Sequence, residues 1–388
     1  MTLLSILYNI RKKLILFTNM ILRYILKIIN MGSWFSKKNE YKDFAESKDQ
    51  DEENLYKLSH YTDLTFEEKK HIDQILRCKE NRDYENLVFE GGGVKGIAYC
   101  GALEILVEYG ILPKIKRFAG ASAGAIMAAF LAIGYTPVEI KNIMYETDFG
   151  TFFKSSDFGM VADIIKFFES SKMGCSTGNK FESFVEKCIE RKTGNPNYTF
   201  GDLYKDTGRT LVIVSTNLNR EMTVYFSHLS HPHMAIKEAV RMSMSIPVLF
   251  MPVHHKVLSG VDLYVDGGVL DNYPIHVFDG KYPGDPQASH NLTTPNPKTL
   301  GLKLLTKDET EDMNMIKRNK INNSKDFLLA LIDTFYASTE RRHMRPTYWK
   351  RTLPIHVINI PMTQFDVTDK EKVILFQNGI DGARENFK

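Results

Sequence analysis

Cysteine is scarce in this sequence, with 4 residues among 388, and none of them forms a C-x-x-C pair or has the spacing of zinc ligands. This scarcity excludes a disulfide-stabilised scaffold and a zinc module. Scattered thiols are typical of a reducing, intracellular compartment. The chain also lacks a cluster of Asp, Glu and His with metal-ligand spacing, so we expect no metal ion and no other cofactor.

A strong net charge is lacking too. The 50 Lys and Arg residues nearly balance the 47 Asp and Glu residues, which leaves a net charge of +3. The body of the chain has no basic patch with interleaved aromatic residues, so nucleic acid is not an expected partner. The hydrophobic fraction of 43% and the charged fraction of 25% are those of an ordinary globular chain.

The first thirty residues contain no run long enough to cross a bilayer. The longest uncharged stretch between their charged residues, residues 14–22, is 9 residues long, whereas a spanning helix needs about 20. On a helical projection Lys12, Arg23 and Lys27 fall on one arc and aliphatic side chains fall opposite. This pattern predicts a basic amphipathic helix that lies in a membrane interface. A secretory signal is the alternative, but no small-residue cleavage site follows.

A short lipidation pattern comes directly after this helix. If translation began at Met31, Gly32 and Ser36 would complete an M-G-x-x-x-S myristoylation signal. We therefore expect a membrane-interacting segment over residues 1–36 and an intracellular protein with peripheral membrane association. The charge-dense stretch that follows predicts a linker over residues 37–80.

Strand and helix patterns alternate from residue 81 onward. Such alternation indicates an α/β sandwich with a mostly parallel central sheet. Ligands of such sheets collect at the carboxyl ends of the strands, where the unusual loops of this chain occur. The patterns predict strands at 86–89, 115–119, 210–215, 263–265, 299–305 and 356–360, and helices at 94–109 and 123–133.

A G-x-S-x-G pentapeptide joins the predicted strand 115–119 to the predicted helix 123–133. Gly120 and Gly124 permit a sharp turn that lifts the hydroxyl of Ser122 clear of the backbone. The helix that follows points its first N–H groups at charge developing there. Ser122 is therefore the candidate nucleophile, and a purely structural turn is the alternative.

A glycine-rich loop also joins a strand to a helix. Its backbone N–H groups can approach an anion closely, and each donor of an oxyanion hole is typically worth ~10²–10³ in rate. A dinucleotide loop is disfavoured because no acidic residue ends a strand ~20 residues later, and a P-loop because no Ser or Thr follows a Gly-Lys pair. A structural turn remains possible. The loop is Gly91-Gly92-Gly93-Val94-Lys95-Gly96.

Asp266 follows the predicted strand 263–265 and is itself followed by Gly267 and Gly268. Two glycines after an acidic residue let the chain turn at the end of the strand. The acidic side chain can then reach a serine on an adjacent strand and accept its proton. A two-residue hairpin turn is the alternative, because Asp-Gly is also a strong hairpin signal.

Together the three loops resemble the patatin-like phospholipase (patatin-like acyl hydrolase) family, in which G-G-G-x-[KR]-G, G-A-S-A-G and D-G-G occur in this order. The resemblance covers residues 86–280, and it includes the segment 241–247 as well as Asn272. It implies a three-layer sandwich, with a catalytic domain at 81–285 and a C-terminal extension of strands and helices at 286–388.

The resemblance also implies the chemistry. Ser122 would form an acyl-enzyme, and Asp266 would deprotonate first Ser122 and then the hydrolytic water, without a histidine. The oxyanion hole would be built from the loop 91–94, chiefly from its last three N–H groups, and Lys95 would steer an anionic phosphate. A phospholipid or other acyl lipid at a membrane surface would be the substrate. Glu90 departs from the family, in which Asp or a small residue is common before the glycines.

Two other functions remain open. An α/β-hydrolase also pairs a glycine-rich loop with G-x-S-x-G, and its histidine comes last in the chain. A membrane-attached scaffold without activity would need neither Ser122 nor Asp266. The histidines available for a triad are His276, His290, His343 and His356.

Overall fold

The computed structural model describes residues 66–152, 173–258, 260–280, 294–306, 346–358, 360, 364–387 and scattered positions from 321 to 336. All of them belong to one compact unit, Leu64–Lys388. The predicted amphipathic helix and the lipidation pattern within residues 1–36 lie outside the described residues. None of the described helices is long and apolar enough to cross a membrane.

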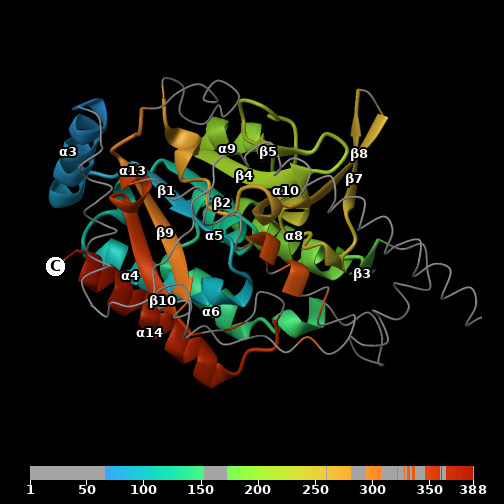
Figure 1. Ribbon diagram of the computed structural model, residues 1–388. Coiled ribbons are helices and arrows are strands. Elements are labelled where there is room, and N and C mark those ends of the chain that lie inside the picture. The colour runs from blue at the N-terminus through green and yellow to red at the C-terminus, as the bar shows by residue number, and fades with distance from the viewer. Residues whose placement is uncertain are drawn as a thin grey trace, which may run out of the picture. The chain divides into compact units, whose positions relative to one another are not determined.

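The centre of this unit is an eight-stranded sheet in the order β10-β9-β1-β2-β4-β8-β7, in which β5 also pairs with β4 (Figure 1). Neighbouring strands from β10 to β4 are parallel, whereas β5, β7 and β8 pair in antiparallel fashion. A separate pair joins β3 to β6. The strands are β1 (Asn86–Phe89), β2 (Arg117–Ala121), β3 (Gly174–Ser176), β4 (Thr210–Asn217), β5 (Met222–Phe226), β6 (Val248–Phe250), β7 (Val253–Val257), β8 (Gly260–Asp266), β9 (Thr299–Thr306) and β10 (Thr352–Val357).

Alternate residues of the parallel strands face two different hydrophobic layers. Along β1, Leu87 and Phe89 join the larger core, which holds most of the helices, and Val88 joins a smaller core on the other face. The smaller core is closed by residues 273–278 and by Tyr348. The sheet is therefore buried on both faces, as parallel sheets generally are.

Helices in the larger layer are packed on the sheet and on one another. Helix α14 lies along α4, and α5 lies on β2 and β4 (Figure 1). The helices are α3 (Phe66–Asn81), α4 (Ala98–Glu108), α5 (Ala123–Ala132), α6 (Pro137–Glu146), α8 (Asn179–Thr193), α9 (Phe200–Thr207), α10 (Ile236–Ser243), α13 (Pro346–Trp349) and α14 (Asp369–Asn386). Short 3₁₀ helices are η2 (Gly93–Ile97), η3 (Leu112–Lys114), η4 (Phe149–Phe152), η5 (Gly267–Val269) and η6 (Ile275–Phe278).

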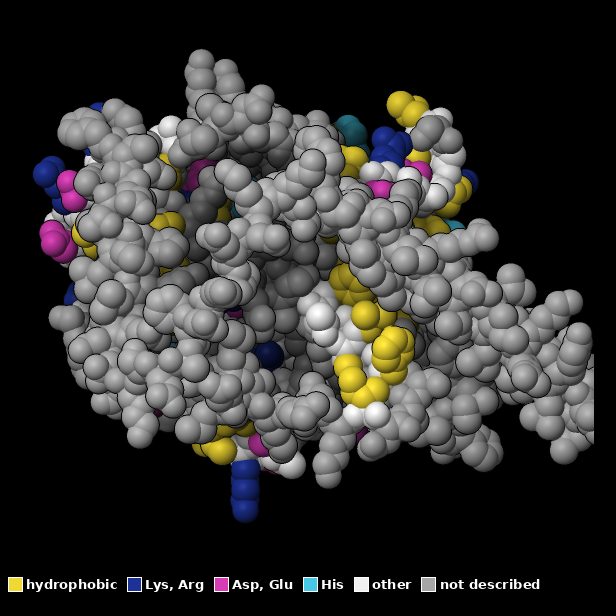
Figure 2. Space-filling model, in the orientation of Figure 1, with side chains coloured by type: hydrophobic (Ala, Val, Ile, Leu, Met, Phe, Trp, Pro, Cys, Tyr) yellow, Lys and Arg dark blue, Asp and Glu magenta, His cyan; other side chains and the backbone are white. Residues whose placement is uncertain are grey.

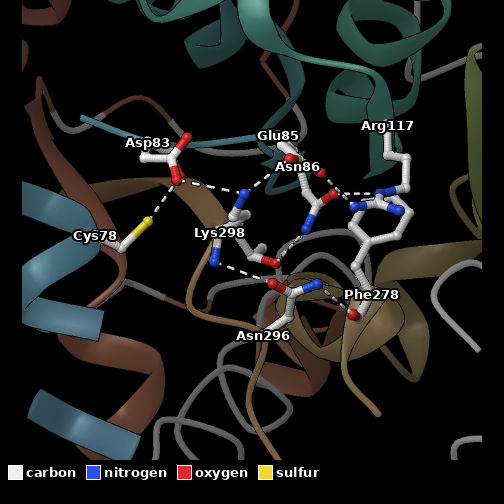
Figure 3. Close-up of polar contacts among 9 residues, drawn as sticks. Cys78, Asp83, Glu85, Asn86, Arg117, Phe278, Asn296 and Lys298 are labelled. Carbon is white, nitrogen blue, oxygen red and sulfur yellow. Dashed lines mark hydrogen bonds and ion pairs between the residues drawn. The ribbon is translucent and has the colours of Figure 1, made fainter. Parts of the chain in front are cut away.

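A polar network ties together the amino ends of β1, β2 and β9 (Figure 3). Asn86 donates to Thr299 Oγ1 at 2.9 Å and accepts from Arg117. Glu85 accepts from Arg117 at 3.1 Å and from Lys298 at 2.9 Å. These contacts fix the strands at the end of the sheet opposite the three motif loops.

The elements confirm the predicted α/β sandwich with a mostly parallel sheet, although several bounds differ. The predicted helix 94–109 begins as the 3₁₀ turn η2, and the last predicted strand is β10, which ends at Val357. The expected linker 37–80 is wrong over its last part, where α3 forms with Ile72 and Ile75 buried. The expected extension 286–388 supplies β9 and β10 to the central sheet itself.

Candidate active site

Ser122 occupies the sharp turn between β2 and α5. Its backbone has φ 51° and ψ −127°, which a residue other than glycine rarely adopts, and its side chain is fully buried. A Cβ at Gly120 would lie 2.3 Å from the carbonyl carbon of Gly124, and a Cβ at Gly124 would lie 2.5 Å from the oxygen of Phe89. Both glycines are therefore required by the close approach of the turn to α5 and β1.

The register of the sheet brings Asp266 to the level of Ser122. Ala121 pairs with Val214, so Ser122 follows at the level of Ser215, and Ser215 is the partner of Asp266. Strand β5 occupies one edge of β4 over Ile213–Asn217, so β2 and β8 pair one after the other along the opposite edge of β4. The structure thus brings together the two side chains that the sequence placed 144 positions apart.

Asp266 is a fully buried carboxyl group. Its Oδ1 accepts from the N–H of Gly268 at 2.7 Å in the turn η5, which excludes the two-residue hairpin. Burial raises the pKa of Asp266 to about 7, and the nearby hydroxyls of Ser122 and Tyr336 oppose that rise. No described residue donates to Oδ2 in full hydrogen-bonding geometry. This oxygen is therefore able to accept a proton near neutral pH.

Residues at and just after the end of α10 bind the backbone N–H groups of Ser122 and Asp266. Ser243 Oγ accepts from the N–H of Ser122 at 2.9 Å, and the carbonyl of Ser245 accepts from the N–H of Asp266 at 3.0 Å. Arg241 is buried and donates to Ser245 Oγ at 2.5 Å. Burial lowers the pKa of Arg241 to about 10, so it stays charged at neutral pH. The Ser122 hydroxyl lies 3.6 Å from Met244 Sδ.

The glycine-rich loop lies beside Ser122, but Gly91 cannot serve as an oxyanion donor. Its N–H already donates to the carbonyl of Asn272 at 3.0 Å, which corrects the expectation for this residue. A Cβ on Gly91 would come within 3.0 Å of the Cβ of Ser122. The N–H groups of Gly92, Gly93 and Val94 have no acceptor among the described residues. Gly93 has φ 57°, the left-handed conformation that favours glycine.

Lys95 and Gly96 complete this loop. Lys95 lies in η2 with a partly exposed side chain. Gly96 is buried, and a Cβ there would come within 3.3 Å of the Cβ of Ala123, so the glycine allows η2 to pack against the start of α5. The steering role of Lys95 stays a prediction.

Two anchors that the sequence did not reveal hold the loop in place. Asn272 Nδ2 donates to the carbonyl of Gly91 at 3.1 Å, and the carbonyl of Asn272 accepts from the N–H of Gly91. The side chain and the backbone of Asn272 therefore both bind Gly91. Glu90 forms a buried ion pair with Lys303 of β9 and accepts from the N–H of Leu304 at 2.8 Å. The position of Asn272 shortly after Asp-Gly-Gly was the feature of the sequence that could have indicated its anchoring role. The partner of Glu90 lies 213 positions away and gave none.

His276 is not placed to act on Ser122. Its Nε2 lies 3.1 Å from the hydroxyl of Tyr225 and 3.7 Å from Oδ2 of Asp271. His356 is exposed on β10, two strands from β1 at the other side of the sheet. His290 and His343 lie outside the described residues.

A narrow apolar pocket opens beside the nucleophile turn. Gly93, Val94 and Ala123 form the end nearest Ser122, and Met244, the neighbour of the serine hydroxyl, lines it as well. Ile126 and Met144 line it too, and the remaining lining residues are Phe149, Phe152, Phe181, Phe250 and Phe365. Such a lining suits an aliphatic chain and excludes a charged group.

The described residues offer no metal site. Among them, no group of three His, Cys, Asp or Glu side chains is placed so that it could hold an ion.

Comparison with known proteins decides the family. A family model described as patatin-like phospholipase matches residues 87–279, which include all three motif loops. An uncharacterized protein of Acanthamoeba polyphaga mimivirus is 36% identical over 303 residues, which cover 78% of this chain and 93% of that protein. This chain belongs to the patatin-like phospholipase family.

Other relatives of this patatin-like protein come from bacteria and viruses. An uncharacterized protein of Bacillus subtilis (strain 168) is 32% identical over 302 residues, which cover 76% of the chain and 95% of that protein. A protein of Invertebrate iridescent virus 6, named "Probable lipid hydrolase 463L", is 27% identical over 197 residues, which cover 50% of the chain and 63% of that protein.

Replacing Asn272 by alanine is expected to lower kcat. The substitution removes the hydrogen bond to Gly91 and frees the glycine-rich loop, and misplacement by ~1 Å at a reacting centre can cost ~10²-fold. We expect a loss of about 10–100-fold in kcat for a soluble short-chain ester, with a nearly unchanged KM. An unchanged kcat in Asn272→Ala would remove the positioning role of this residue.

Proposed function

We propose that this patatin-like protein is a lipid acyl hydrolase that cleaves fatty-acyl esters of phospholipids or related acyl lipids through an acyl-enzyme on Ser122. The observation that carries the proposal is the buried carboxyl group of Asp266, held at the level of Ser122 with a pKa of about 7. The family match and the name of the viral relative favour a lipid ester as substrate.

In the first step Asp266 accepts the proton of the Ser122 hydroxyl while the oxygen attacks the ester carbonyl. A general base is most effective when its pKa lies near the working pH, and burial supplies this here. The tetrahedral intermediate carries a negative oxygen. The N–H groups of Gly92, Gly93 and Val94 are assigned to hold that oxygen, because they lie at the amino end of η2 and lack acceptors among the described residues.

In the second step the acyl-enzyme is hydrolysed. Before this step the first tetrahedral intermediate has collapsed and expelled the alcohol, which took the proton from Asp266 and so restored the carboxylate. That carboxylate then deprotonates a water molecule as the water oxygen attacks the acyl carbonyl. When the second tetrahedral intermediate collapses, the bond to Ser122 breaks, Asp266 returns the proton to the serine oxygen and the fatty acid is released. One carboxyl group thus serves both half-reactions.

The acyl chain is assigned to the apolar pocket beside the nucleophile turn. Val94 and Ala123 would contact its first carbons, and the phenylalanines Phe149, Phe152 and Phe181 would contact its distal end. Burial of each CH₂ group contributes about 0.8 kcal/mol. A charged or strongly polar acyl group would lose its hydration there without compensation.

Labelling tests the nucleophile directly. A serine-directed fluorophosphonate should modify Ser122, and peptide mass spectrometry should locate the adduct there. An α/β-hydrolase triad would require His276→Ala to abolish labelling, whereas our proposal leaves labelling intact in that variant. A non-catalytic scaffold would give no adduct at all.

Activity on a dispersed substrate is expected to persist in excess chelator. Our proposed mechanism transfers protons only between Ser122, Asp266, water and the leaving alcohol, and the described residues include no cluster suited to an ion. The measurement is the rate on a soluble ester with and without chelator. Loss of activity that calcium or zinc restores would contradict the metal-free mechanism.

Peripheral membrane association is part of the proposal. It is supported by the sequence of residues 1–30, where Lys12, Arg23 and Lys27 share one helical arc. A substrate embedded in a bilayer is reached fastest by an enzyme already held at that surface.

A further inference from the structure

The hairpin of β7 and β8 projects beyond the sheet at the end that carries Ser122. Strand β8 pairs with β4 from Asp266 to Tyr264, and its first residues continue past the end of β4. The seven residues of β8, Gly260–Asp266, span about 20 Å, because six steps of ~3.3 Å separate the first from the last. Because β4 is parallel to β2, this direction is also that of the carboxyl end of β2, where Ser122 lies.

The tip of this hairpin is apolar and fully exposed. Leu258 is 111% exposed and Val261 is 50% exposed. The adjacent β4–β5 turn presents Leu218 at 45% and Met222 at 38% exposure, and the N–H of Leu218 donates to Leu263 of β8 at 2.9 Å. A single exposed leucine would need no explanation, but four apolar side chains at one edge form a patch.

Charge on the hairpin tip itself is basic, whereas the β4–β5 turn beside it carries the exposed Glu221 next to Arg220. Residues 253–261 contain one lysine, two histidines and no acidic residue. Asp262, which follows them, is buried and accepts from Asn217 at 2.9 Å and from Arg220 at 2.8 Å. Figure 2 shows hydrophobic, Lys or Arg, and Asp or Glu side chains together in the upper right, where Figure 1 draws the β7–β8 hairpin. Aliphatic groups in front of basic ones match the order of acyl chains and anionic headgroups at a lipid surface.

We propose that the β7–β8 hairpin, with Leu258 at its tip, inserts into the lipid surface that carries the substrate. This inference rests on the proposed function, because a lipid acyl hydrolase has to meet its substrate at such a surface. The aliphatic tip leaves water for the acyl region, while Lys256 stays at the headgroups. Insertion turns the carboxyl edge of the sheet, and with it the nucleophile turn, toward the interface.

Leu258→Asp in the full-length Ser122→Ala protein tests the insertion. With vesicles of phosphatidylcholine and phosphatidylglycerol, sedimentation should show about tenfold weaker binding or more, since burying a leucine is worth ~1.5–3 kcal/mol. The matched control is Val107→Asp. Val107 is 46% exposed near the carboxyl end of α4, at the opposite end of the sheet, and its replacement should leave binding unchanged. Equal binding by Leu258→Asp and its parent would overturn the proposal.

A local probe separates the hairpin from any other lipid contact of the chain. In Leu258→Trp, brominated lipids should quench the added fluorescence, whereas in Val107→Trp they should not. Absence of quenching at position 258 would overturn the proposal, as would a Leu258→Asp variant that changes self-association and leaves vesicle binding intact. In the active protein, Leu258→Asp should keep its rate on a soluble short-chain ester. If the active protein without the Leu258→Asp change failed to hydrolyse that ester, the proposed function would be contradicted. The vesicle-binding assays use the Ser122→Ala protein and do not depend on activity.

Discussion

Replacing Ser122 by alanine is expected to lower kcat/KM for a soluble ester by about 10⁴-fold or more, since nucleophile and base act as one unit. Asp266→Asn should cause a loss of similar size, because the amide has the shape of the carboxyl group but cannot accept the proton. Both variants should stay folded, which circular dichroism and thermal unfolding would check. Ester hydrolysis with a chromogenic short-chain substrate is the measurement.

His276→Ala is the matched control for these two variants. His276 contacts Tyr225 and Asp271, so its loss should change the rate by less than about threefold, within the effect of a surface substitution. If His276→Ala were as damaging as Ser122→Ala and Asp266→Asn were mild, a Ser–Asp–His triad would replace the mechanism proposed here.

Both activity and stability should depend on the protonation of Asp266. The carboxylate is the active base, so kcat/KM should rise with pH and level off above about pH 7. The folded pKa is raised from 3.8 to about 7, which means that the folded state binds this proton more tightly than the unfolded state does. The favourable contribution of the protonated group is therefore complete below pH 3.8 and is lost as pH rises through about 7.

Asp266→Asn should accordingly be more stable than the wild type at alkaline pH. The shift corresponds to up to about 4 kcal/mol at ~1.4 kcal/mol per pKa unit. Chemical denaturation between about pH 5 and about pH 8 would measure it, and the advantage of the variant should grow with pH across this range. A difference that is independent of pH would mean that the buried carboxyl group does not titrate near neutrality.

The site could be predicted from the sequence where its chemistry depends on short segments. Gly120, Gly124 and Ser122 form one continuous turn, and the glycines are needed because a Cβ would collide with α5 and β1. Asp266 was likewise recognisable at a strand end. Nothing in the sequence indicates that the N–H of Gly91 donates to the carbonyl of Asn272, because only the folded chain brings these two residues together.

Other parts of the fold depend on contacts that leave little local trace. Strand β7 reads Val-His-His-Lys-Val and lies at the edge of the sheet, where half-exposed positions tolerate polar residues. Helix α3 is strongly charged and buries only a few positions, such as Ile72 and Ile75. The predicted domain bounds at 81–285 and 286–388 remain predictions, while β9 and β10 pair within the central sheet.

The pairing of β1 with β9 has a consequence for biosynthesis. Strand β1 is among the first parts of the sheet to be made, yet one of its two neighbours and the lysine that neutralises Glu90 come 213 residues later. During translation the glycine-rich loop therefore lacks the Glu90–Lys303 ion pair until β9 has left the ribosome. The glycine-rich loop can therefore take its final position only after β9 has joined the sheet.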